Sequence, residues 1–272
     1  MTYPSKALSI ILGAKGLLGS ELYTQIKKRG DIVVALDKGS DSERIDKSEY
    51  VDINDLKSNQ IHDQISKNNY NAINIFFAQM YTEKANASLK KIKNTDLTEM
   101  EYRNEIISSW INSDSDEFLE AMKNQICFAD DFLKKLNECL GNDCYRKNII
   151  FFGSVFEKNS FLLSGFFKNE NFFFKHPAYF TAKKSLVAYQ SFLADIFLNK
   201  NIYINTISPG VLERSQENNF ANWIRQKTPI SKSLVTVSEV VNIALFLSDL
   251  NGRASAIHNQ IIYADRGWSS NV

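Results

Sequence analysis

Residues 10–22, IILGAKGLLGSEL, place Gly13, Gly16 and Gly19 between an apolar run and an amphipathic segment. Glycines at this spacing let the chain turn tightly after a strand, let backbone N–H groups approach a pyrophosphate, and let the following helix pack closely on the strand. The N-terminus of that helix adds a dipole that favours an anion. The stretch therefore predicts the first strand, turn and helix of an α/β fold, with a dinucleotide site at the turn.

The rest of the chain continues this alternation of short apolar runs and longer amphipathic ones, which is typical of βαβ units on a parallel sheet. With 272 residues, 44% of them hydrophobic, the chain is long enough for one α/β domain. We expect a single domain with a Rossmann-like, doubly wound parallel sheet of about seven strands flanked by helices. Strands are expected at Leu8–Leu12, Ile32–Leu36, Ile73–Phe77, Asn148–Phe152, Ile202–Ile207 and Gln260–Tyr263, with a weaker one at Glu49–Val51. The longest helices are expected at Glu117–Leu136, Ala178–Leu198 and Val237–Leu247.

The composition excludes several classes of function. The net charge is +1, and basic and acidic residues are interspersed, so neither nucleic acid nor an anionic membrane is an expected partner. The three cysteines are odd in number and lack the spacing of a zinc site, which favours a reducing compartment over a disulfide scaffold. The apolar start is too short for a signal-peptide core or a membrane span. We expect a soluble, cytoplasmic protein.

The second expected strand ends at an acidic residue. Asp37 lies 18 residues after Gly19, where a carboxylate can bond the ribose 2′-hydroxyl of a dinucleotide and repel a 2′-phosphate. This favours NAD, with NADP as the alternative, because Lys15 and Lys38 could offset the repulsion. Asp52 falls where a third strand would end near the adenine, and it reads almost equally well as a solvated turn residue.

Two Tyr-x-x-x-Lys pairs occur, Tyr23 with Lys27 and Tyr179 with Lys183. Since the chain has 11 tyrosines and 32 basic residues, chance alone gives roughly one such helical neighbour pair. The spacing by itself therefore does not identify an active site.

The order of the signals along the chain does identify one. The sequence resembles the short-chain dehydrogenase/reductase family over almost its whole length. FFGSVFE (151–157) resembles the family's strand with an active-site serine, here Ser154, and EAMKNQICFADDF (120–132) resembles its helix with an active-site asparagine, here Asn124. PAYFTAKKS (177–185) resembles the tyrosine and lysine helix, INTISPGVLER (204–214) the Pro-Gly loop beside the nicotinamide, and IIYADRGWS (261–269) the last strand and its turn. Only the pair Tyr179 and Lys183 follows the serine and precedes the Pro-Gly loop, so Tyr23 and Lys27 are interpreted as a solvated helix face.

This resemblance implies a mechanism without a metal. Tyr179 is the acid in reduction and the base in oxidation. Lys183 favours the phenolate and bonds the nicotinamide ribose, Ser154 orients the substrate oxygen, and Asn124 holds a water that links Lys183 to solvent. The expected cofactor-binding residues are Gly13, Lys15, Gly16, Leu18, Gly19, Asp37, Asp52, Ile53, Ala78, Tyr179, Lys183, Pro209, Gly210 and Leu212.

Two departures from the family pattern bear on the cofactor site. Phe76, Phe77, Ala78 and Gln79 replace the family's Asn-Asn-Ala-Gly-like turn, which predicts a loss of polar groups near the cofactor ribose. Leu17 stands where many members have the second glycine, a spacing more familiar from the longer sugar-nucleotide epimerase branch, whereas the ADRGW ending favours the shorter branch.

Within that branch the chain resembles oxidoreductases of flagellin and surface-glycan (nonulosonic acid) sugar biosynthesis. The leading interpretation is an NAD(P)-dependent oxidoreductase acting on a hydroxyl or keto group of a small, polar, sugar-derived substrate such as a sugar phosphate or nucleotide sugar. A 3-oxoacyl-thioester reductase and a non-catalytic nucleotide-binding sensor are the alternatives.

The family resemblance further implies a homodimer or homotetramer that assembles through two long helices. The phenylalanine-rich insertion 155–176 is expected either to seal a subunit interface or to act as a lid over the substrate pocket.

Overall fold

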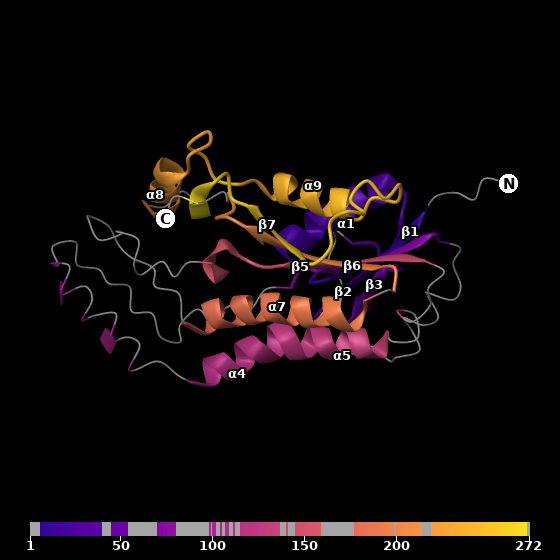
Figure 1. Ribbon diagram of the computed structural model, residues 1–272, viewed down its shortest axis with the longest axis horizontal. Helices are drawn as coiled ribbons and strands as arrows, with labels where there is room; N and C mark the ends of the chain where they lie inside the picture. The colour runs from indigo at the N-terminus through magenta and orange to yellow at the C-terminus, as the bar shows by residue number, and fades with distance from the viewer. Residues whose placement is uncertain are drawn as a thin grey trace.

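The structure of the protein is a computed structural model (Figure 1). It describes residues 6–39, 45–53, 70–79, 98, 100–101, 104, 107–108, 111, 115–136, 140, 145–158, 177–198, 200–213 and 219–270. Most of the phenylalanine-rich insertion, residues 159–176, lies outside these ranges.

Seven parallel strands form one sheet in the order β3-β2-β1-β4-β5-β6-β7. The chain adds strands on one side of β1 as far as β3 and then continues with β4 on the other side of β1. This doubly wound order confirms the expected fold class. The strands are β1 (Ala7–Leu12), β2 (Ile32–Asp37), β3 (Tyr50–Asp52), β4 (Ala72–Phe77), β5 (Arg146–Phe152), β6 (Ile202–Pro209) and β7 (Gln260–Ala264). The expected strands coincide with them to within two residues at either end.

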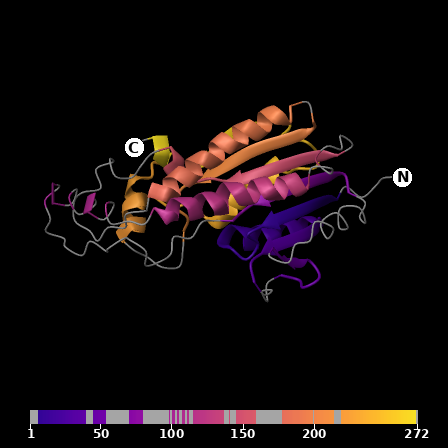
Figure 2. The ribbon, with the colours of Figure 1, turned by 90° about the horizontal axis from the view of Figure 1, so that it is seen from below.

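Helices cover both faces of the sheet (Figures 1 and 2). On one face α1 (Leu17–Arg29) and α9 (Val237–Leu247) pack in a core with the inward residues of β1, β5 and β6. On the other face α5 (Phe128–Lys135) and α7 (Pro177–Ile196) pack against the alternate residues of the same strands, and α4 (Asp116–Met122) leads into α5. Strands buried on both faces read as continuous apolar runs, which is why they were visible in the sequence.

The long helix expected at Glu117–Leu136 is interrupted. A π-helical turn, Lys123–Cys127, separates α4 from α5 and carries Asn124. Short π-turns inside α-helices are rare and occur frequently at functional sites. A further helix, α8 (Asn219–Lys227), was not foreseen from the sequence.

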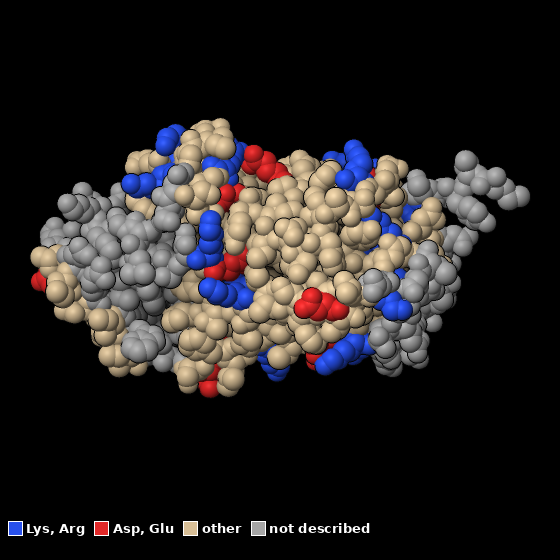
Figure 3. All heavy atoms as spheres, viewed as in Figure 1, with Lys and Arg blue, Asp and Glu red and all other residues tan. Residues whose placement is uncertain are grey.

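The described surface carries both signs of charge. On the face in Figure 3, lysine and arginine side chains are scattered together with aspartate and glutamate, with wide uncharged areas between them. None of the helices placed in the structure combines the length and apolarity needed to cross a bilayer. Within the described part of the chain, His, Cys, Asp and Glu form no group that could hold a metal ion.

Candidate dinucleotide and catalytic site

The glycine turn joins β1 to α1 with almost no space for side chains. Gly13 has φ of +82°, and a Cβ there would lie 2.6 Å from the backbone nitrogen of Gln79. A Cβ on Gly19 would lie 2.0 Å from the carbonyl oxygen of Gly13, so the helix can pack this close only with glycine. Gly16 is the N-cap of α1, and no side chain caps the first-turn N–H groups. These features fit a pyrophosphate at the helix N-terminus.

The carboxylate of Asp37 is held in place at the end of β2. Its Oδ2 accepts the backbone N–H of Lys15 at 2.7 Å, and its Oδ1 accepts that of Lys38 at 2.7 Å. The Nζ of Lys15 donates to the carbonyl oxygen of Lys38 and lies 5.4 Å from the centroid of the Tyr50 ring. The Asp37 carboxylate is thus fixed beside the glycine turn, and the Lys15 ammonium group lies close to it.

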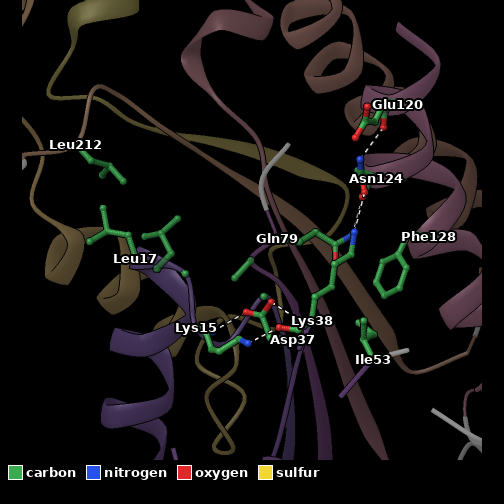
Figure 4. Close-up of a pocket in the computed structure, with 14 residues that line it drawn as sticks. Lys15, Leu17, Asp37, Lys38, Ile53, Gln79, Glu120, Asn124, Phe128 and Leu212 are labelled. Atoms are coloured by element: carbon green, nitrogen blue, oxygen red, sulfur yellow. Dashed lines mark hydrogen bonds between the residues drawn. The ribbon is translucent and has the colours of Figure 1, made fainter. Parts of the chain in front are cut away.

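A cavity of about 540 Å³ opens beside the glycine turn and Asp37 (Figure 4). It is lined by Gly13, Lys15, Gly16, Leu17, Leu18, Asp37, Lys38, Ile53, Ala78, Gln79, Glu120, Asn124, Phe128 and Leu212. Eight of the expected cofactor-binding residues line it, and Asn124 is the one expected catalytic residue among the lining residues. The volume lies within the range of small-molecule sites, about 300–1,000 Å³.

Other expected site residues lie outside this lining. Gly19 serves the packing of α1, and Asp52 pairs with Asp37 in the β2–β3 register while its neighbour Ile53 lines the cavity. Pro209 is the last residue of β6, and the Gly210 N–H donates to the Ala264 carbonyl at 2.9 Å. This bond attaches the Pro-Gly loop to the end of β7.

A polar clasp connects the end of β4 to the π-turn. The side-chain amide of Gln79 donates to the carbonyl oxygen of Asn124 at 3.1 Å, and that of Gln125 donates to the carbonyl of Gln79 at 3.4 Å. Asn124 Nδ2 donates to the Glu120 carbonyl at 2.9 Å, and its Oδ1 accepts from Lys38 Nζ at 3.4 Å. Figure 4 shows Gln79 between Asn124 and the Asp37 corner. Gln79 thus lines the cavity as one polar residue of this turn, and its side-chain amide is bonded to the π-turn.

Tyr179 and Lys183 lie one turn apart on α7 and are both buried, with 6% and 3% of their surface exposed. Lys183 Nζ donates to the carbonyl oxygen of Phe152, the last residue of β5, at 2.8 Å. The Tyr179 ring lies 6.1 Å from that of Phe156, which follows Ser154 in the chain. The helix α7 also packs on the π-turn that carries Asn124. Ser154, Tyr179 and Lys183 thus lie in elements that meet at the carboxyl end of β5, whereas Asn124 lies on the π-turn that packs on α7.

Ser154 begins a 3-10 turn, Val155–Glu157, and its side chain takes part in a capping box with Glu157. Its Oγ accepts the backbone N–H of Phe156 at 3.4 Å, which leaves the hydroxyl proton available to donate elsewhere. Phe156 is the one phenylalanine of the insertion within the described residues, and it is buried against Tyr179 and the Trp268 ring.

Glu157 is a site residue that the sequence analysis missed. It is buried, its Oε1 accepts the Ser208 hydroxyl at 2.5 Å, and its Oε2 accepts the backbone N–H of Ser154 at 3.4 Å. Burial raises the pKa of the Glu157 carboxyl, against smaller lowering effects of Ser208, Ser154, Lys183 and Tyr263. The motif Ser-x-x-Glu was present in SVFE and could have indicated the capping box.

Part of the chain matches a known protein family in sequence. Residues 157–269 match the family model described as enoyl-(acyl carrier protein) reductase, a model of the short-chain dehydrogenase type. This match covers less than half of the chain, and the rest of the likeness to known proteins is one of fold. No curated protein matches it.

Solved structures with the same fold superpose over nearly the whole chain. A putative D-mannonate oxidoreductase from Haemophilus influenza with bound NAD has a TM-score of 0.73 and 19% identity, covering 98% of this chain and 96% of that one. A short chain dehydrogenase from Leptospira borgpetersenii serovar Hardjo-bovis with bound NAD+ has a TM-score of 0.63 and 17% identity, covering 97% and 93%. A 4-hydroxyisoleucine dehydrogenase complexed with NADH has a TM-score of 0.63 and 16% identity, covering 98% and 100%.

Proposed function

We propose that the chain is a short-chain dehydrogenase/reductase, which catalyses NAD-dependent hydride transfer to or from a hydroxyl or keto group of a small, polar, sugar-derived substrate. The observation that carries the proposal is the buried pair Tyr179 and Lys183, bonded to the end of β5 two residues before Ser154 and packed on the π-turn that lines the cavity. A sensor that only binds a nucleotide has no need of a proton donor, so this set favours an enzyme.

NAD is the proposed cofactor. The glycine turn, the uncapped N-terminus of α1 and the fixed Asp37 carboxylate would hold its pyrophosphate and ribose, and the carboxylate would repel a 2′-phosphate. Several neighbours in fold were crystallised with NAD, NAD+ or NADH. Bound nicotinamide supplies the hydride chemistry.

The residues of the chain then handle the substrate oxygen and its proton. Tyr179 donates the proton in reduction and takes it in oxidation. Ser154 donates its hydroxyl proton to the substrate oxygen, because its Oγ already accepts the N–H of Phe156. Lys183 adds positive charge one helical turn from the phenol, and Asn124, on the π-turn that packs on α7, holds a water that links Lys183 to solvent.

A sugar-derived substrate is supported by sequence resemblance and by one neighbour. The chain resembles oxidoreductases of surface-glycan pathways, and the structure of TM-score 0.73 is a putative D-mannonate oxidoreductase. An acyl-thioester substrate is the second candidate, favoured by the description of the family model that residues 157–269 match. The two classes differ in polarity, so a direct screen separates them.

The test is a substrate screen that follows NADH absorbance, with a sugar acid such as mannonate, sugar phosphates, nucleotide sugars and oxoacyl thioesters side by side. Saturable turnover of a sugar derivative with NAD or NADH is the expected result. Turnover confined to the thioesters would establish the second candidate. Failure of every substrate class, with NADH also failing to bind, would refute the oxidoreductase proposal.

We also propose that the chain forms a homodimer or homotetramer through the two long helical segments expected at Glu117–Leu136 and Ala178–Leu198, which correspond to α4 to α5 and to α7. These helices carry exposed apolar side chains, including Leu119 (71% exposed) and Phe192 (54% exposed). Light scattering at micromolar concentration should give a multiple of the 31.1 kDa chain mass. A monomer would refute this proposal and leave the enzymatic one intact.

A further inference from the structure

The buried Glu157 carboxylate fixes the turn that follows Ser154, residues Val155–Glu157. Glu157 closes the capping box on Ser154, and a Cβ on the adjacent Gly153 would come within 2.6 Å of its Oε2. The Glu157 carboxylate therefore packs directly against the backbone at Gly153, and only glycine at this position leaves room for it.

The same carboxylate reaches two other strands. Its Oε1 accepts the Ser208 hydroxyl at 2.5 Å, near the end of β6, and it also bonds the Tyr263 hydroxyl on β7. Lys158 continues the attachment, since its Nζ donates to the Ser269 carbonyl at 3.1 Å and lies 5.3 Å from the Tyr263 ring centroid. Glu157 is thus a link between the serine turn and the β6–β7 edge.

A carboxylate at this place is costly for the fold. It is 6% exposed, and its burial raises its pKa, so the charged form is disfavoured. A neutral side chain of similar size could fill the same space without the free-energy cost of burying a charge. Residues kept at a cost in stability cluster where function needs them.

We infer that Glu157 is a positioning residue of the active site, which holds the Ser154 hydroxyl in its substrate-facing orientation by anchoring the serine turn to Ser208. The inference rests on the proposed function, because it assigns Ser154 to the substrate oxygen. Misplacement of a catalytic group by about 1 Å can cost about 100-fold in rate, so even a small relaxation of this turn is measurable.

The chain offers a matched control. Thr236 and Glu239 form a second capping box, at the start of α9, with Thr236 N–H donating to Glu239 Oε2 at 2.8 Å. Glu239 is bonded to Arg266, which lowers its pKa to about 2, and its side chain is 46% exposed. Glu157→Ala and Glu239→Ala therefore open the same motif, one in the serine turn and one at the start of α9.

The first measurement is steady-state turnover with the substrate found in the screen. Glu157→Ala should lower kcat about 10-fold or more, with NADH affinity within about twofold of the unmodified protein. Glu157→Gln should recover most of this loss, since an amide can accept from Ser154 and donate to Ser208. A kcat for Glu157→Ala within about twofold of Glu239→Ala would overturn the inference. If Glu157→Ala does not fold, Ser208→Ala removes the other end of the link, and unmodified turnover in it would overturn the inference.

The second measurement needs no substrate. Hydrogen exchange of the ligand-free protein should become faster at residues 154–158 in Glu157→Ala and only at residues 236–240 in Glu239→Ala. Unchanged exchange at residues 154–158 would overturn the inference. If the unmodified protein turns over no substrate, the proposed function fails, while the exchange result still decides whether Glu157 fixes the turn.

Discussion

The two Tyr-x-x-x-Lys pairs have the same spacing on two helices and very different surroundings. On α1, the Tyr23 hydroxyl donates to Glu49 Oε2 at 2.7 Å, and Lys27 Nζ forms an ion pair with Glu49 Oε1 at 2.5 Å. On α7, Lys183 donates to the neutral carbonyl oxygen of Phe152 and is almost fully buried, whereas the Lys27 side chain is 41% exposed. The difference teaches that the residues facing the pair, and not its spacing, decide what it can do.

The chemical consequence is clearest for Tyr23. Burial raises the pKa of its hydroxyl, and the bonded Glu49 carboxylate raises it further. A phenol held protonated by a neighbouring anion cannot serve as a base at neutral pH. Tyr23 is therefore a buried structural residue that bonds α1 to the segment before β3, so the interpretation of this pair as a solvated helix face holds for Lys27 and is wrong for Tyr23.

The largest expected effect is that of removing the phenol oxygen on α7. Tyr179→Phe should lose at least about 100-fold in turnover, the lower range for a positioned acid or base. NADH binding, followed by fluorescence titration, should change less than about twofold because the glycine turn and Asp37 are untouched. Turnover equal to that of the unmodified enzyme would remove Tyr179 from the mechanism.

The lysines give the next comparison. Lys183→Met should lower turnover by roughly 10- to 100-fold, because it removes a buried positive charge beside Tyr179. Lys27→Met removes a surface ion pair worth about 0–1 kcal/mol and should leave turnover unchanged. An equal loss of turnover in Lys183→Met and Lys27→Met, measured in one assay, would contradict the different roles given to α7 and α1.

A smaller effect is expected at the cofactor end of the site. Asp37→Ala should weaken NAD binding about 10-fold, since a hydrogen bond to a charged group contributes about 1.5 kcal/mol at the lower end of its usual range, and should improve NADP binding relative to NAD. Paired titrations with the two cofactors measure the ratio. If the unmodified protein already prefers NADPH, then Lys15 and Lys38 determine the specificity and the role given to Asp37 is wrong.

The smallest effect on turnover is expected for Tyr23→Phe. It should leave kcat unchanged and lower the free energy of unfolding by about 1–2 kcal/mol, through the lost bond to Glu49. Because the pKa of Tyr23 is raised above 10.0 in the folded state, this contribution is fully present below pH 10 and is lost as the pH rises through the folded value. Denaturant unfolding at pH 7 and pH 9 should therefore show the same loss.

Local sequence signals predicted most of the architecture. The strands were visible because both faces of a parallel sheet are buried, and the turn at Gly13 to Gly19 was visible because only glycine fits those contacts. The π-turn was not predicted, since its hydrogen bonds with Gln79 join two segments that are far apart in the sequence. Glu157 was missed for the same reason, because its partner Ser208 lies 51 residues away in the chain.

The central claim, that catalysis belongs to the pair on α7, is tested most directly by the ratio of kcat for Tyr23→Phe to that for Tyr179→Phe. Both variants should be assayed at saturating NADH with the substrate identified by the screen. The account predicts a ratio of at least about 100. A ratio near 1 would contradict it.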